Sequence, residues 1–199
     1  LREQVGGRAE IPQVIHQIWL GPKEPPCPLI DTFRVHYVSA HSGWEHRLWT
    51  DESAAQLPMF NRKIFEKEQS WRCKSDILQL ECLWHYGGVY VGVDTIWLKV
   101  SSLQQILELG QDRGLVLGYG PDVKDRPFPT LDTALVACTP RHPLILMLIL
   151  YLQRLYPLKR EGIDPWADTG GLMYTKCLVD SGMPFTVASA DVLYGDAGL

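Results

Sequence analysis

The sequence contains no run of Lys or Arg that could form a phosphate-binding stripe, and its formal net charge is −4. Proteins hold nucleic acid mainly through its backbone phosphates, so this absence argues against a nucleic-acid-binding protein. The longest apolar run, at 143–152, is far shorter than the roughly 20 residues of a membrane-spanning helix. No signal-peptide pattern is visible either. We therefore expect no membrane segment within these residues.

Several motifs that would mark other protein classes are also missing. The five cysteines form no CxxC pair and no metal-ligand spacing. Glycine-rich loops of the GxGxxG or GxxxxGK type are absent, which disfavours dinucleotide-binding and P-loop proteins. No grouping of Ser, His and Asp, or of Cys and His, supports a hydrolase. Three cysteines lie in apolar patterns and are expected to be small core residues: Cys82, Cys138 and Cys177.

Apolar and polar stretches alternate along the chain and predict strands and helices in turn. With 199 residues and an apolar fraction of 46%, the chain is long enough to bury one sizeable core. Residues 1–10 are polar and contain glycine, so we expect a flexible lead-in before a single α/β domain at 11–199. The alternation of strands and helices predicts a mostly parallel central sheet.

The stretch 75–94, SDILQLECLWHYGGVYVGVD, shows the clearest pattern. Apolar side chains recur at helical spacing over 75–86 and predict a helix with one buried face. Ser75 is expected to cap its first turn, and Asp76 lies where a helix dipole favours an acid. The diglycine that follows ends the helix, and a short buried strand leads to Asp94. This carboxylate is therefore expected at the sheet edge where open α/β sheets bind ligands.

The remaining elements are predicted from the same patterns. The stretch 14–20 is nearly continuously apolar, which favours a central parallel strand. Further strands are predicted at 44–49, 97–100, 115–119, 131–138, 185–188 and 192–194. Helices are predicted at 29–39, 103–109, 143–156 and 172–179. Residues 61–72 have a helical tendency, and 51–53 suit a helix start. A loop is predicted at 121–129 and a polar turn at 164–171.

These residues resemble a known family. The matching residues occur in one order: Ser75-Asp76, Gly87-Gly88, Tyr90 and Asp94. They are similar to the DXD-containing sugar-binding region of nucleotide-sugar glycosyltransferases, which include fungal initiating α-1,6-mannosyltransferases and, more remotely, the glucosyltransferase domains of large clostridial toxins. The stretch 11–21, IPQVIHQIWLG, resembles the family's first strand and base-binding loop.

The resemblance implies a GT-A-like, Rossmann-like domain with a nucleotide-sugar half at 11–100 and an acceptor-side half at 101–199. It also implies transfer of a hexose from a UDP-sugar to a glycan or glycoconjugate acceptor, with retention of configuration. A divalent cation, Mn²⁺ or Mg²⁺, would neutralise the leaving diphosphate through oxygen ligands. Asp94 matches the family's direct metal ligand, and Asp191 or Asp196 could assist it.

Donor contacts are implied for residues in both parts of the nucleotide half. Trp19 would stack on the uracil ring, although a Trp at a strand end is equally typical of a core. Asp76 would contact hydroxyls of the donor hexose, although it also suits a helix N-terminus. Other candidates for donor or nucleotide binding are His16, Gln17, Ile18, Arg72 and Tyr90.

The sequence departs from the family pattern at three positions. Gly92 stands where the first Asp of the DXD motif is expected, so the motif reads Gly-Val-Asp. Gln79 replaces an Arg; as a catalytic candidate it would orient the donor sugar with Asp76 through hydrogen bonds, without the positive charge. Asp132 falls near a family Asn that faces the donor, and it stays a donor-binding candidate. On the acceptor side, a turn similar to the family's is formed by Asp168, Gly170 and Gly171.

These departures leave other interpretations open. One is a catalytically degenerate relative that binds carbohydrate or nucleotide. Another is an otherwise normal enzyme silenced by an introduced Gly92, and a third is a hydrolase of the donor. Because the first residue is Leu1 rather than Met, we expect a piece of a longer protein. Many family members are Golgi enzymes with an N-terminal anchor, which would lie upstream and would imply the Golgi lumen.

Overall fold

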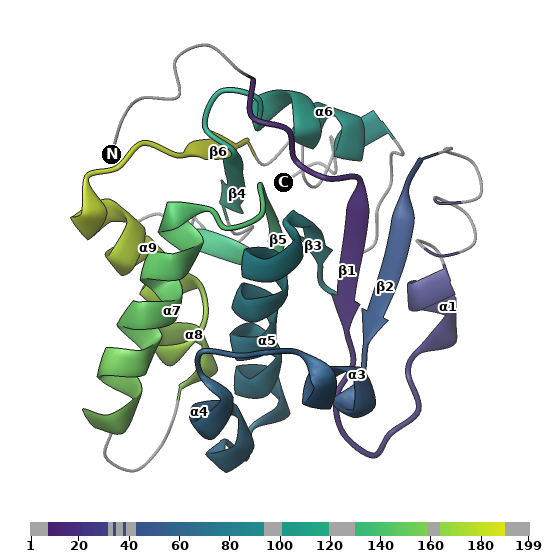
Figure 1. Ribbon diagram of the computed structural model, residues 1–199, viewed down its shortest axis with the longest axis vertical. Coiled ribbons are helices and arrows are strands. Elements are labelled where there is room, and N and C mark those ends of the chain that lie inside the picture. Colours follow the sequence, from purple (N-terminus) through teal and green to yellow (C-terminus); the bar gives the residue numbers. More distant parts are fainter. Residues whose placement is uncertain are drawn as a thin grey trace, which may run out of the picture.

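The computed structural model describes residues 8–31, 34, 38, 43–93, 101–119, 130–158 and 164–189. Helices and strands alternate along this chain (Figure 1). The strands are β1 (Val14–Ile18), β2 (Glu45–Trp49), β3 (Gly88–Val91), β4 (Leu115–Tyr119), β5 (Leu131–Cys138) and β6 (Thr186–Ala188). The helices are α1 (Cys27–Asp31), α3 (Asp51–Gln56), α4 (Arg62–Lys67), α5 (Trp71–Tyr86), α6 (Ser101–Leu109), α7 (Pro143–Leu155), α8 (Pro165–Asp168) and α9 (Gly171–Ser181), with a 3₁₀ turn at Tyr156–Leu158.

The six strands form one sheet in the order β2-β1-β3-β5-β4-β6. β1 lies inside the sheet, next to the edge strand β2, and is parallel to both neighbours, as its apolar run predicts. β5 runs antiparallel to β3 and to β4, whereas β6 is parallel to β4. The predicted α/β domain with a mostly parallel sheet is confirmed.

Helices cover both faces of the sheet. Along β4, Leu115 and Leu117 join the core beneath α5, α7 and α9, whereas Val116 points to the opposite core with Ile106 of α6. This alternation follows from the two-residue period of a strand. Figure 1 shows α5, α7 and α9 side by side on one face. The cysteines predicted to be core residues are buried and free, which confirms that prediction: Cys82, Cys138 and Cys177.

The central helix begins earlier than the sequence pattern indicates. Ser70 is the N-cap of α5, and its hydroxyl accepts a hydrogen bond from the amide of Cys73. Ser75 lies inside the helix and donates its own hydroxyl to the carbonyl of Trp71 at 2.9 Å. The prediction that Ser75 caps the helix is therefore wrong. Asp76 consequently lies in the second turn, beyond the free amides of the helix start.

The diglycine ends α5 as predicted. Gly87 and Gly88 have φ angles of 61° and 91°, a region that L-residues with a side chain rarely adopt. A Cβ on Gly88 would lie 2.6 Å from the carbonyl oxygen of Val14, so this glycine lets β3 approach β1 closely. The pairing of these two strands brings their carboxyl ends to the same edge of the sheet.

Two other predictions need correction. The predicted turn at 164–171 contains the short helix α8, which Asp164 caps by accepting a hydrogen bond from the amide of Trp166 at 3.0 Å. The helix predicted at 29–39 begins earlier, at Cys27. The strands predicted at 97–100 and 192–194, the loop at 121–129 and most of 32–39 lie outside the described residues.

Gly171 allows the first turn of α9 to touch the sheet. A Cβ there would lie 2.3 Å from the carbonyl oxygen of Leu131 on β5, a backbone atom that cannot move alone. We expect Gly171→Ala to lower the free energy of unfolding by about 3 kcal/mol, measured by urea denaturation. Gly110→Ala is the matched control, since its Cβ would lie 2.3 Å from the flexible methyl end of Ile11. It should cost about 1 kcal/mol or less, and equal losses would contradict this explanation.

Candidate functional site

A cleft of 560 Å³ opens at the carboxyl ends of β1 and β3. In open α/β sheets this edge is the usual ligand site, because strand order and loop connections leave a crevice there. The first two turns of α5 and the first residues of antiparallel β5 complete its walls. The lining residues are Ile18, Trp19, Leu20, Pro22, Lys23, Trp71, Arg72, Ser75, Asp76, Tyr90, Gly92, Val93, Asp132, Thr133 and Ala134.

Seven candidates from the sequence meet in this cleft. They come from four separate parts of the chain and are Ile18, Trp19, Arg72, Asp76, Tyr90, Gly92 and Asp132. Asp94 lies outside the described residues, but its chain neighbour Val93 lines the cleft. Asp191 and Asp196 also lie outside them. His16, Gln17, Gln79, Asp168, Gly170 and Gly171 are described and do not line it.

His16 is held inside the core below the cleft. Its Nδ1 accepts a hydrogen bond from Nε1 of Trp49 at 3.0 Å, and its Nε2 lies 2.9 Å from the carbonyl oxygen of Gly87. Since an indole N–H can only donate, the imidazole proton must be on Nε2, which donates to Gly87. Burial lowers the pKa of His16 to about 4, so the ring is neutral at physiological pH. His16 thus joins β1 to the end of α5.

Gln17 and Gln79 are also buried. Oε1 of Gln17 lies 2.9 Å from Nε2 of His46 on β2. The amide of Gln79 donates to the carbonyl oxygen of Thr133 at 3.0 Å, and its Oε1 has no partner within the part of the chain described. Thr133 itself lines the cleft. Gln79 is thus placed behind the cleft wall, where it holds the start of β5 against α5.

Trp19 lies at the cleft with its indole held by a tight loop. Its Nε1 donates to the carbonyl oxygen of Lys23 at 2.7 Å. The loop turns at Gly21, which has φ = 97° and whose amide donates to the carboxylate of Asp51 at 2.8 Å. A Cβ on Gly21 would lie 3.0 Å from the ring of Trp71, so the glycine lets this second indole pack against the loop. Two tryptophans therefore flank the same loop.

Asp76 is the carboxylate on α5 that lines the cleft. Burial raises its pKa to about 7, while a hydrogen bond from Thr169 and the positive charge of Arg72 act in the opposite direction. The hydroxyl of Thr169 lies 2.6 Å from Oδ2 of Asp76. A carboxyl group that titrates near neutrality in a cleft is typical of a functional site, although ion-pair networks produce such shifts as well.

The raised pKa of Asp76 makes stability depend on pH. Between its unfolded pKa of about 4 and about 7, the native protein keeps a proton that the unfolded chain has lost. The free energy of unfolding should therefore fall as pH rises through this window. Asp76→Asn removes this contribution. We therefore expect the free energy of unfolding of the variant, relative to that of wild type, to be about 2 kcal/mol higher at pH 8 than at pH 4.5. Urea denaturation at both pH values tests this, and a constant difference would contradict it.

The structure adds residues to the site that sequence reasoning missed. Lys23 and Trp71 line the cleft, and Trp71 is 46% exposed. Thr133 contributes a further hydroxyl, and Thr169 contacts Asp76. The Trp directly before Arg72 was a usable signal, because aromatic side chains suit stacking on sugars and bases. Thr169 is separated from Asp76 by 93 residues, and only the fold reveals that contact.

The oxygen chemistry of the cleft suits a hard divalent cation. Asp76 and Asp132 both line it, and Oδ1 of Asp132 accepts a hydrogen bond from the amide of Ala134 at 2.9 Å. Within the described ranges, no three His, Cys, Asp or Glu side chains form a cluster that could hold a metal ion. Asp94, the expected metal ligand, lies outside these ranges.

The family comparison agrees with this geometry. Residues 32–111 match the model described as "Glycosyltransferase sugar-binding region containing DXD motif". This segment is similar to a glycosyltransferase sugar-binding region. It supplies α5 and β3 to the cleft, together with the diglycine between them. The resemblance identified in the sequence is thereby confirmed, and it supports glycosyl transfer as the general activity.

Curated relatives of the sugar-binding region come from Schizosaccharomyces pombe (strain 972). Inositol phosphoceramide mannosyltransferase 2 is 27% identical over 99 residues, and inositol phosphoceramide mannosyltransferase 1 is 29% identical over 100 residues. Each alignment covers 45% of this chain. The aligned parts span only 27% and 30% of the two relatives. Their whole-protein activities therefore reach beyond the part that is matched here.

Solved structures share the fold around the sugar-binding region. PaToxG glycosyltransferase has a TM-score of 0.67 and 16% identity, covering 88% of this chain and 71% of that chain. The ligand-free glycosyltransferase domain from the YGT toxin has a TM-score of 0.52 and 10% identity, covering 92% and 81%. At these identities the likeness shows the fold. Among the helices of the described chain, none has the length and apolar character needed to cross a membrane.

Proposed function

We propose that this protein transfers a hexose from a nucleoside diphosphate sugar, a UDP-sugar, to a glycan or glycoconjugate acceptor. The observation that carries the proposal is the cleft at the ends of β1 and β3, where residues from both halves of the domain converge. Its lining includes the aromatic ring of Trp19, two cationic side chains and two carboxylates: Lys23, Arg72, Asp76 and Asp132. A base, a diphosphate and a hydroxyl-rich sugar need this set of groups.

Each group matches one part of the donor. Trp19 would stack on the uracil ring, and its hydrogen bond to Lys23 would hold the ring plane in place. Arg72 and Lys23 would contact the diphosphate, since charge-assisted hydrogen bonds to phosphate are strong. Asp76, in its ionised form, would accept hydrogen bonds from hexose hydroxyls. Tyr90 and the backbone at Gly92 would form the floor on which the donor lies.

We include a divalent cation, Mn²⁺ or Mg²⁺, in this proposal. When bound, it would neutralise the leaving diphosphate. Asp94 would be its protein ligand, because it follows Val93 at the cleft and matches the second acid of the DXD motif. Gly92 in place of the first acid would weaken the donor contacts rather than remove the metal ligand. Retention of configuration belongs to the proposal through the family resemblance.

The acceptor is proposed to enter past Trp71. This indole is 46% exposed at the cleft and lies against Gly21, so one broad apolar surface faces the approach to the donor. Aromatic surfaces of this kind stack on sugar rings. The two Schizosaccharomyces pombe relatives are named inositol phosphoceramide mannosyltransferases, and their names indicate a lipid-linked acceptor. Asp168, Gly170 and Gly171 lie on this second half of the domain, outside the cleft lining.

The second candidate function is a binding module without turnover. Two observations favour it: Gly92 lacks a carboxylate, and Gln79 is buried behind β5 instead of offering a charge to the donor. Such a module would bind the donor weakly and without regard to Mn²⁺. Restoring the acid with Gly92→Asp separates a silenced enzyme from a long-degenerate site, because only the former would regain transfer.

Calorimetric titration of UDP, and then of UDP-glucose, with and without Mn²⁺, tests the proposal. Tight binding that requires the metal supports the transferase. Binding that ignores Mn²⁺ supports the module, and no binding under any condition overturns both nucleotide-based functions. Release of free glucose without an acceptor would instead identify a donor hydrolase.

A further inference from the structure

A buried hydroxyl from the second half of the domain contacts the carboxylate of Asp76. Thr169 follows α8 and has no exposed surface. Its Oγ1 lies 2.6 Å from Oδ2 of Asp76 on α5 and 3.1 Å from the carbonyl oxygen of Pro165. The two bonded residues are 93 positions apart in the chain. Thr169 thus connects the turn before α9 to the carboxylate at the cleft.

The hydroxyl has one proton and two acceptors within reach. When Asp76 is ionised, the proton of Thr169 is donated to the carboxylate, which offers the shorter and stronger bond. When Asp76 is neutral, its own proton can be donated to Oγ1, and Thr169 then donates to Pro165. Both states keep Oδ2 of Asp76 bound to the same atom. The carboxyl group therefore has one fixed oxygen in either protonation state.

The turn that carries Thr169 is itself held against the sheet. Its amide donates to the carbonyl oxygen of Pro165 at 3.3 Å. A Cβ on Gly170 would lie 2.9 Å from that same oxygen, and a Cβ on Gly171 would lie 2.3 Å from the carbonyl oxygen of Leu131. These two glycines bring the backbone to close contact with α8 and β5. The position of Thr169 relative to the cleft is therefore set by backbone packing.

We propose that Thr169 is the positioning residue for Asp76, fixing one carboxylate oxygen so that the other faces the hexose of the donor. This inference rests on the proposed function, because it assigns Asp76 to the donor sugar. The turn at 168–171 does not line the cleft, but through Thr169 it would orient Asp76, which does. A residue of the acceptor-side half, 101–199, would thereby influence how the nucleotide-sugar half, 11–100, recognises the donor sugar.

Other groups near Asp76 bear on its ionisation. On α5, Arg72 favours the charged carboxylate, and Cys73 is a neutral thiol whose pKa burial raises. Tyr174 faces it from α9, with its own pKa raised by burial. Asp132 lines the same cleft from β5. Thr169 donates a hydrogen bond to the Asp76 carboxylate, so removing its hydroxyl separates the proposed contact from these charges.

The first test needs no donor. Thr169→Val keeps the side-chain shape and removes the hydroxyl, whereas Thr169→Ser keeps the hydroxyl. A ¹³C titration of the Asp76 carboxyl by NMR should show its midpoint about one pH unit higher in Thr169→Val than in wild type, because the ionised form loses a donor. Thr169→Ser should titrate like wild type. An unchanged midpoint in Thr169→Val overturns the proposal, whether or not the protein binds UDP-sugars.

The second test separates the sugar from the nucleotide. Thr169→Val should weaken UDP-glucose binding by about tenfold and leave UDP binding unchanged, and Thr169→Ser should restore UDP-glucose affinity. Equal loss for both ligands would show a general structural role and overturn the proposal. If Thr169→Val does not fold, Thr169→Ala takes its place in both tests. Wild type that binds neither ligand would overturn the proposed function, and the titration would still decide the role of Thr169.

Discussion

Asp94→Asn is expected to raise the Kd of UDP in the presence of Mn²⁺ by about 100-fold, to the value measured without metal. Asn preserves the size of the side chain but removes the charge that a hard cation requires. Asp94 follows Val93 at the cleft, and no cluster of metal-binding side chains exists elsewhere in the described residues. Calorimetry over a series of Mn²⁺ concentrations measures the effect.

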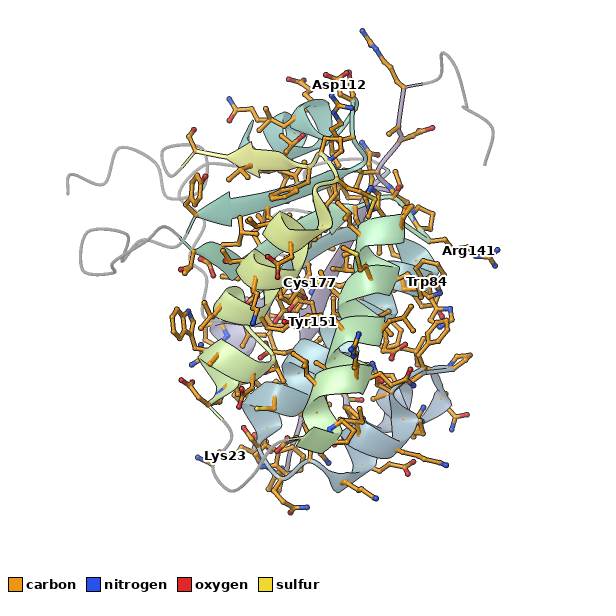
Figure 2. The ribbon with its side chains drawn as sticks, turned by 90° about the vertical axis from the view of Figure 1, so that its left-hand side faces the viewer. Lys23, Trp84, Asp112, Arg141, Tyr151 and Cys177 are labelled. Atoms are coloured by element: carbon orange, nitrogen blue, oxygen red, sulfur yellow. The ribbon has the colours of Figure 1, made fainter. Side chains whose placement is uncertain are left out.

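The control for this prediction is an acid away from the cleft. Asp112 is exposed at the opposite end of the molecule from Lys23, as Figure 2 shows. Asp112→Asn changes the net charge by the same amount and should leave the Kd unchanged. If Asp94→Asn retained full Mn²⁺ dependence, the cation would have to bind elsewhere, and the assignment of Asp94 as its ligand would be wrong.

Trp19→Ala should weaken binding of UDP and UDP-glucose alike, by about 10- to 100-fold. Stacking of a base on an aromatic ring contributes about 1–3 kcal/mol, and Trp19 is the aromatic residue that β1 delivers to the cleft. Both ligands carry the same base, so their affinities should fall together. Calorimetric titration of each ligand, under the metal condition that binds best, provides the measurement.

Trp19→Phe distinguishes stacking from loop support. Phe keeps an aromatic face but cannot donate to the carbonyl oxygen of Lys23, as the indole does at 2.7 Å. A loss of only a few fold in Trp19→Phe would assign the effect to stacking. If Trp19→Phe and Trp19→Ala lost the same affinity, the loss would come from the hydrogen bond to Lys23 and the loop it holds. The stacking role of Trp19 would then be contradicted.

Much of the fold follows from local patterns in the sequence. The stretches 115–119 and 131–138 are strands with the predicted bounds. Apolar residues fill most of the first and the second half of the other, as buried strands require. The diglycine at the end of α5 has the positive φ angles that only glycine adopts readily. These features depend on neighbours in the chain, and so the sequence contains enough information to predict them.

The site was less predictable because its contacts connect distant residues. Ser70 and Ser75 are both good N-cap residues, and only the packing of Cys73 and Ile77 in the core decides where α5 begins. His16 and Gln17 lie beside Trp19 in sequence, yet the strand places them in the interior, bonded to Gly87 and His46. The contact between Thr169 and Asp76 has no local signal at all.

The antiparallel strand β5 has a consequence for the modular organisation of the protein. β5 lies between β3 and β4, and its first residues complete the cleft that the sugar-binding region begins. The family match at 32–111 contains neither β1 nor β5, the two strands that flank β3. Excised alone, it would leave both edges of β3 unpaired, a state prone to aggregation. The unit that recombination can transfer between proteins is therefore the whole six-stranded sheet. The segment 32–111, which defines the family, forms only the central part of that unit.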